Sequence, residues 1–88
     1  MISRKVTVQN PMGLHARPAS DFVKTASKCK SNVNIYVREG MPINAKSILG
    51  VLSAGICQGT EITIEADGAD ERESTEKLVH LVESNFGE

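Results

Sequence analysis

The chain has 88 residues, of which 40% are hydrophobic and 24% are charged, and its formal net charge at pH 7 is -1. These values are typical of one small globular domain, so we expect residues 1–88 to fold as a single domain. Nucleic-acid binding usually shows an excess of basic residues together with aromatic side chains for stacking. With 10 basic residues against 11 acidic ones and 3% aromatic residues, the composition argues against a nucleic-acid partner.

The sequence also argues against membrane insertion and against metal or dithiol chemistry. The amino-terminal stretch MISRKVTVQN has no long apolar run and does not resemble a signal peptide, and no segment approaches the length of a membrane span. Cys29 and Cys57 lack the C-x-x-C spacing of metal and redox sites. We therefore expect a cytoplasmic protein with two free thiols, no metal and no cofactor.

The first element that the sequence predicts is a half-buried strand, in which Ile2, Val6 and Val8 share one parity. The stretch NPMG at positions 10–13 then has the residue preferences of a type I turn. From about residue 16 to residue 28, apolar residues recur at the spacing of one helix face. This pattern predicts an amphipathic helix that buries Ala19, Phe22, Val23 and Ala26.

Two further strands follow the first helix. Val33, Ile35 and Val37 alternate with polar residues, and Glu39-Gly40 provides a hairpin turn into a short third strand through Ile43. Pro42 has no N–H to donate to a ladder, so this third strand is expected at an edge of the sheet.

The second half of the chain repeats the alternation of strand and helix. A short helix is predicted from Ser47 to about Ser53, stopped by Gly55, and a fourth strand carries Ile62, Ile64 and Ala66 on one face. Asp70 and Glu73 have the spacing of a capping box. They open a last helix that ends near Gly87 and has one apolar side, formed by Leu78, Val79, Val82 and Phe86.

The predicted order is strand, helix, strand, strand, helix, strand, helix, which indicates the α+β class. Because the strands are polar on one face, we expect an antiparallel sheet with one face open to water and the other covered by the three helices.

The start of the first helix is the most informative position in the sequence. Pro18 suits a first helical turn, but none of the usual N-cap residues Ser, Thr, Asp or Asn precedes it, and Leu14, His15, Ala16 and Arg17 stand there instead. The free amides and the positive end of the helix dipole therefore lack a side-chain acceptor. Such a helix end is a potential site for an anion.

His15 and Arg17 give this helix start a nucleophile and a phosphate ligand. A neutral imidazole nitrogen can attack phosphorus, and a guanidinium recognises phosphate oxygens. The sequence shows no second acid or base and no nucleotide-binding glycine loop, which favours a carrier of a phosphoryl group over a self-contained enzyme. The alternative is that His15 and Arg17 are ordinary surface residues, as we expect for His80 in the last helix.

Three motifs resemble the HPr family, the histidine-containing phosphocarriers of the bacterial phosphoenolpyruvate-dependent sugar phosphotransferase system. They are GLHARPAS at Gly13–Ser20, AKSILGVLSAGI at Ala45–Ile56 and GTEITIEADGADE at Gly59–Glu71. The resemblance extends over essentially the whole chain. It implies an open-faced β-sandwich whose four-stranded sheet has the order 1-4-2-3.

The resemblance also implies a role for each matching residue. His15 would accept the phosphoryl group of phosphorylated enzyme I on Nδ1 and pass it to the IIA units of sugar permeases. Arg17 would stabilise the phosphate beside it, in the helix start formed by Ala16, Arg17 and Pro18. An apolar docking patch would comprise Ile48, Leu49 and Leu52, flanked by Ser20 and Lys24 of the first helix.

The second motif resembles the form found in low-GC Gram-positive bacteria, in which its serine is phosphorylated by the ATP-dependent HPr kinase/phosphorylase. The matching residue is Ser47. From the residues alone, Ser47 is better explained as a helix N-cap, because serine caps are common, whereas the motif match favours a phosphorylation site.

Two other functions remain open at this stage. Some relatives lack the active histidine and act only through the phosphoserine, as corepressor for the catabolite control transcription factor. The second alternative is a small phosphatase-like enzyme, which would need a second catalytic group near His15. We expect a monomer that makes no contact with nucleic acid and does not insert into a membrane.

Overall fold

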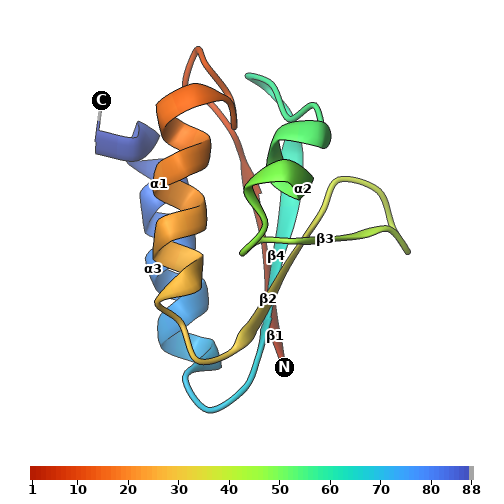
Figure 1. Cartoon of the computed structure of the whole chain (residues 1–88), viewed down its shortest axis with the longest axis vertical. Coiled ribbons are helices and arrows are strands. Elements are labelled where there is room, and N and C mark those ends of the chain that lie inside the picture. Colours follow the sequence, from red (N-terminus) through yellow and green to blue (C-terminus); the bar gives the residue numbers. More distant parts are fainter. Residues whose placement is uncertain (88) are drawn as a thin grey trace.

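A computed structural model describes residues 1–87 and contains the predicted elements in the predicted order (Figure 1). The strands are β1 (Ile2–Thr7), β2 (Asn32–Tyr36), β3 (Pro42–Asn44) and β4 (Glu61–Asp67). The helices are α1 (Ala16–Ser27), α2 (Ile48–Ser53) and α3 (Glu71–Glu83), and a short 3-10 turn spans Asn85–Gly87.

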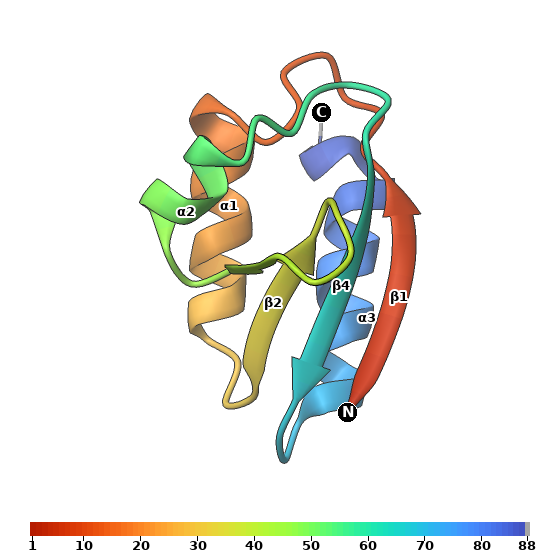
Figure 2. The same ribbon diagram turned by 90° about the vertical axis from the view of Figure 1, so that its right-hand side faces the viewer.

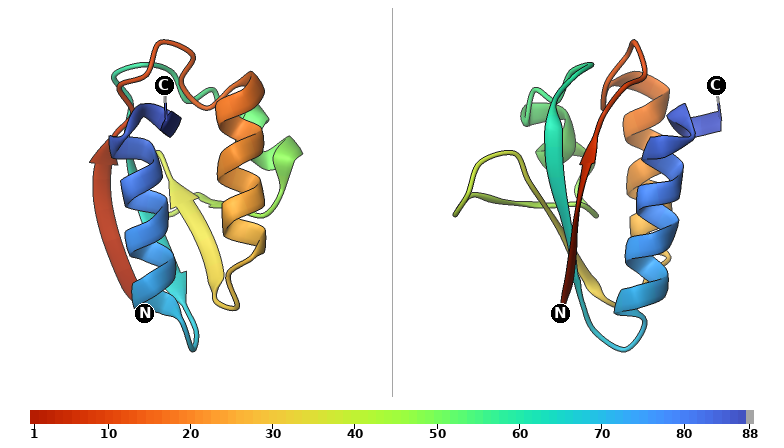
Figure 3. Two further views of the ribbon diagram at one scale, coloured as in Figure 1. Left: turned by 90° about the vertical axis from the view of Figure 1, so that its left-hand side faces the viewer. Right: turned by 180° about the vertical axis from the view of Figure 1, so that it is seen from behind.

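The four strands form one antiparallel sheet in the order β1-β4-β2-β3, which confirms the open-faced β-sandwich (Figure 2). Helices α1 and α3 lie side by side against one face of this sheet, while α2 lies beside α1 and β3 (Figure 3). Pro42 pairs with Tyr36 in the edge strand β3, as its missing N–H predicted.

Strand alternation places the core between the sheet and the helices. Val6, Ile62, Ile64, Val33 and Ile35 point to this side and are buried, whereas their polar neighbours face the open side. The prediction was wrong for Val37, because β2 ends at Tyr36 and Val37 is exposed in the hairpin that follows. That hairpin closes through a hydrogen bond from Met41 N to Arg38 O, with Glu39 and Gly40 at its centre.

The helices bury the faces that their periodicity indicated. Helix α1 buries Ala19, Phe22 and Ala26, and α3 buries Leu78, Val79 and Val82. Phe86 is also buried, but it lies beyond α3 in the 3-10 turn, with a φ of 57°. The helix therefore ends earlier than expected, and the chain turns to insert the phenyl ring into the core.

The capping box predicted at the start of α3 is not formed. Asp70 is the N-cap residue, but its side chain makes no capping hydrogen bond. Its two carboxylate oxygens instead accept hydrogen bonds from Lys30 N at 2.9 Å, from Ser31 N at 2.8 Å and from the Ser31 hydroxyl. Glu73, the expected partner, forms an ion pair with Lys77. Asp70 thus ties the loop between α1 and β2 to the start of α3.

These hydrogen bonds hold the pKa of the Asp70 carboxyl well below its usual range, first through the Ser31 hydroxyl and then through the Lys30 amide. A carboxyl with a depressed pKa in the folded state stabilises the fold above its pKa in the unfolded chain, which is about 3.9. This stabilisation is lost progressively as the pH falls below that value.

We expect Asp70→Asn to lower the free energy of unfolding at pH 7, because an amide presents one acceptor oxygen to three donors. The difference from the wild type should shrink as the pH falls below about 4. Urea unfolding followed by circular dichroism, at a series of pH values, measures both effects.

Asp67→Asn is the matched control, because it removes an exposed carboxylate from the same end of the molecule. Equal stability of the wild type and Asp70→Asn at pH 7 would contradict the structural role of Asp70.

Candidate functional site

The loop before α1 is closed by two hydrogen bonds between its ends. Gly13 N donates to Asn10 O at 3.1 Å, as expected for the NPMG turn. The Asn10 side chain is fully buried, and its Nδ2 donates to Gly13 O at 2.9 Å. Sequence reasoning treated Asn10 as a turn residue and missed that its buried carboxamide also braces the loop.

The same loop is packed closely against the chain that leads into β4. Gly13 has a φ of 62°, and a Cβ atom built on it would lie 2.4 Å from Ile56 O and 2.8 Å from Cys57 Cα. Leu14 N donates to Ile56 O at 3.0 Å, and the Leu14 side chain is fully buried. These contacts fix the residue that precedes His15.

His15 is the N-cap residue of α1, and its side chain is half-buried. Its backbone is extended, with φ -129° and ψ 162°, and its side chain makes no capping hydrogen bond. No acidic residue lies in the first turn of α1. The prediction of a helix start without a side-chain cap is therefore confirmed.

Ala16 adopts a left-handed conformation, with a φ of 52°. No feature of the sequence indicates this conformation, because glycine and asparagine are the residues that usually adopt it. The conformation costs about 1–2 kcal/mol for a residue with a Cβ atom. It is held between Leu14 and Pro18, which are both buried, whereas the Ala16 side chain itself is exposed. The backbone is thus strained at the residue that joins His15 to the helix.

Arg17 is close to His15 in sequence but is paired elsewhere. Its side chain is 85% exposed, and its Nε lies 3.8 Å from Asp21 Oδ2, one turn further along α1. Sequence reasoning missed Asp21, although the i, i+4 spacing of the two charges was a usable signal.

Ser47 caps α2 as predicted. Its Oγ accepts a hydrogen bond from Gly50 N at 3.1 Å, and its backbone carbonyl accepts one from Val51 N at 3.0 Å. The neighbouring Lys46 Nζ donates to Cys29 O at 3.0 Å, just beyond the C-terminal end of α1. The start of α2 is therefore tied to the end of α1.

The predicted docking patch is exposed. Ile48, Leu49 and Leu52 are 40%, 74% and 39% exposed, which is unusual for three large apolar residues of one short helix. Helix α1 lies beside α2 and contributes the half-buried Ser20 and the exposed Lys24. Whether a partner binds there stays a prediction.

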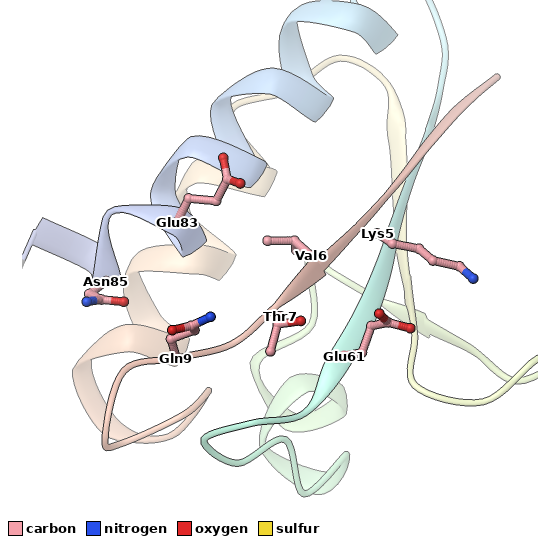
Figure 4. Close-up of a pocket in the computed structure, with 7 residues that line it drawn as sticks. All are labelled: Lys5, Val6, Thr7, Gln9, Glu61, Glu83 and Asn85. Carbon is pink, nitrogen blue, oxygen red and sulfur yellow. The ribbon is translucent and has the colours of Figure 1, made fainter.

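A polar hollow of about 460 Å³ lies elsewhere, between the end of β1 and the end of α3 (Figure 4). Lys5, Glu61 and Glu83 line it, and all three are exposed, which is typical of a solvated surface. His80 is also exposed, as expected for a surface histidine. Cys29 and Cys57 are both free thiols, the first buried and the second exposed.

Two absences hold for the described part of the chain, residues 1–87. No group of three or more His, Cys, Asp or Glu side chains is placed to bind a metal ion. No helix there has the length and apolar character needed to cross a membrane.

Residues 2–84 match the family model described as the PTS HPr component phosphorylation site. The chain belongs to the HPr family. It is 41% identical to the phosphocarrier protein HPr of Xylella fastidiosa over 88 residues, covering all of this chain and 98% of that protein. It is 43% identical to the HPr-like protein Crh of Bacillus subtilis over 83 residues, covering 94% of this chain and 96% of Crh.

The solved structures agree with this assignment. The crystal structure of HPr-C-His from Thermoanaerobacter tengcongensis superposes with a TM-score of 0.95 at 44% identity, covering all of this chain and 98% of the other. Membership of the HPr family places the chain among the phosphocarriers of the phosphotransferase system and implies partners within that system.

We expect Gly13→Ala to destabilise the HPr fold by more than the roughly 1–2 kcal/mol that a left-handed alanine costs. The added Cβ would also press on Ile56 O and the Cys57 backbone. Urea unfolding measures the loss, and amide chemical shifts at His15 should report displacement of the loop.

Gly40→Ala is the control, because Gly40 has a φ of 80° but a Cβ atom there would meet nothing within 4 Å. Similar losses for the two variants would show that the contact with Ile56 and Cys57 contributes nothing.

Proposed function

We propose that residues 1–88 form one phosphocarrier domain in which His15 accepts a phosphoryl group from phospho-enzyme I on Nδ1 and donates it to the IIA units of sugar permeases. The observation that carries this proposal is the half-buried His15 at the start of α1, a helix end that has no side-chain cap. A carrier needs a nucleophile with an adjacent anion site, and this position offers both.

The helix start is suited to the oxygens of the transferred group. As the Nδ1–P bond forms, the bond between phosphorus and the donor breaks, and the donor keeps its electron pair. The amides of Ala16 and Arg17 lie at the positive end of α1, where negative charge is stabilised. Pro18 lacks an N–H and sets the backbone of this first turn. The Arg17 guanidinium is exposed, so it has room to reach the phosphoryl group.

The docking surface in this proposal is the apolar patch Ile48, Leu49 and Leu52, flanked by Ser20 and Lys24. Arg17, Lys24 and Lys46 place three positive charges around it. A partner that binds this surface should present apolar side chains surrounded by acidic ones, which would steer the encounter and make it salt-sensitive.

We expect His15→Ala to abolish phosphoryl transfer from enzyme I in the presence of phosphoenolpyruvate and Mg²⁺, while the domain stays folded. The reason is that His15 is the nucleophile in this proposal and lies at the surface end of the helix. An acid-labile, base-stable phosphate on the wild type is the readout.

His80→Gln is the matched control, since it removes the other histidine, which is exposed on α3. His80→Gln should accept the phosphoryl group as the wild type does. An acid-labile phosphate on His15→Ala would exclude His15 as the acceptor.

A second, regulatory function is supported by Ser47. Its hydroxyl lies at the start of α2, next to the apolar patch, and the similar protein Crh is described as HPr-like. We propose that HPr kinase/phosphorylase modifies Ser47 and that the product is recognised by a catabolite control transcription factor. A phosphate adds roughly -1.5 to -2 charges at neutral pH, and a helix start tolerates negative charge.

The two functions should oppose each other at the shared surface. We expect Ser47→Asp to slow the initial rate of His15 phosphorylation, because a carboxylate beside the patch repels an acidic partner surface. Ser47→Ala should leave the charge unchanged and serves as the control, with circular dichroism to monitor folding. Equal rates for both variants, and for protein phosphorylated by the kinase, would return Ser47 to the role of a helix cap.

A further inference from the structure

An acidic side chain one helical turn along α1 forms an ion pair with Arg17 in this structure. Arg17 Nε lies 3.8 Å from Asp21 Oδ2, with the two side chains 85% and 34% exposed. Asp21 is thus the more buried partner, and the more exposed Arg17 side chain has the space to change position. An exposed pair of this kind contributes little to folding stability. Its position matters because Arg17 is the only guanidinium within two residues of His15.

We propose that Asp21 is a positioning residue for phosphoryl transfer, which acts by competing with the phosphoryl group on His15 for the Arg17 guanidinium. This role rests on the proposed function of His15. Asp21 itself exchanges no proton and forms no bond in the reaction. It sets where Arg17 lies before and after transfer.

The competition follows from charge and geometry. A guanidinium binds a carboxylate or a phosphate through the same N–H fork. In the unphosphorylated protein Asp21 is its acidic partner at 3.8 Å. When His15 carries the phosphoryl group, Arg17 must leave or weaken the contact with Asp21 in order to bind the phosphate oxygens. The favourable interaction between Arg17 and Asp21 is therefore lost only in the phosphorylated state.

Asp21 therefore makes phospho-His15 less stable relative to free His15. For a carrier this favours donation, since the phosphoryl group must leave as readily as it arrives. An exposed pair of this type corresponds to a change of about twofold to fivefold in an equilibrium constant. We expect Asp21→Asn to shift the phosphoryl group toward the protein by that factor.

The first measurement is a direct competition. Enzyme I equilibrates a limiting amount of phosphoryl group between isotopically labelled wild type and unlabelled Asp21→Asn in one solution, and mass spectrometry gives the phosphorylated fraction of each. The variant should hold about twofold to fivefold more phosphate than the wild type. Glu73→Gln is the matched control, because it removes an i, i+4 pair with Lys77 at 3.1 Å on α3, and it should partition equally with the wild type.

The second measurement does not need enzyme I. Phosphoramidate phosphorylates histidine directly, with transfer of phosphorus from the amide nitrogen to the ring and release of ammonia. In a His80→Gln background only His15 can react, and ³¹P NMR titration then follows the phosphoryl group itself. Its pKa should be lower in Asp21→Asn, because Arg17 binds the dianion more fully.

The Arg17→Ala background separates positioning from direct repulsion. Asp21→Asn should have no effect on the partition or on the ³¹P titration when Arg17 is absent. The same effect with and without Arg17 would overturn the positioning role, as would equal values for the wild type and Asp21→Asn. If enzyme I fails to phosphorylate the wild type, the proposed function fails, and the ³¹P titration still decides the role of Asp21 by the same criterion.

Discussion

The close contact between Gly13–Leu14 and Ile56–Cys57 is the constraint on which the site depends. Leu14 N bonds to Ile56 O at 3.0 Å, and Gly13 approaches so closely that a Cβ atom would overlap the same carbonyl. Because the following strand β4 lies in the interior of the sheet, between β1 and β2, this contact attaches the start of α1 to the chain that enters an interior strand. His15 therefore lies at the fixed end of a loop. Ala16, which follows it, is held in a strained conformation between the buried Leu14 and Pro18.

Helices α1 and α2 are in contact and are linked at the end away from His15. Lys46 Nζ donates to Cys29 O, and Ser47 caps α2 directly after it. The two proposed phosphorylation sites, His15 and Ser47, thus lie at the starts of two helices, α1 and α2, that pack against each other. If both sites are phosphorylated as proposed, a negative charge at either one would weaken the attraction of that surface for an acidic partner.

Two charged side chains of this fold, Asp70 and Arg17, have partners other than those that the sequence analysis expected. The Asp70 side chain does not cap α3. It accepts hydrogen bonds from Ser31 and Lys30 instead, and these lower the pKa of its carboxyl. Arg17 pairs with Asp21, with Nε and Oδ2 3.8 Å apart. The i, i+4 spacing of Arg17 and Asp21 is visible in the sequence, whereas the donors that reach Asp70 come from a distant loop and are revealed only by the folded structure.

The sequence by itself determined the order of the elements, the faces that they bury, the edge position of β3 and the missing cap at His15. These follow from local rules, since hydrophobic period, the missing N–H of proline and the absence of a capping side chain are properties of neighbouring residues. Tertiary structure alone decided the left-handed Ala16, the buried Asn10 carboxamide, the partners of Asp70 and the early end of α3 before Phe86. The partners of Asp70 depend on contact between distant parts of the chain, since Ser31 and Asp70 are 39 positions apart. The hydrogen bond of Asn10 to Gly13 is local, but the burial of its carboxamide depends on the rest of the fold. A local sequence pattern does not indicate which distant groups come into contact. Those contacts are decided by how the sheet packs against its helices.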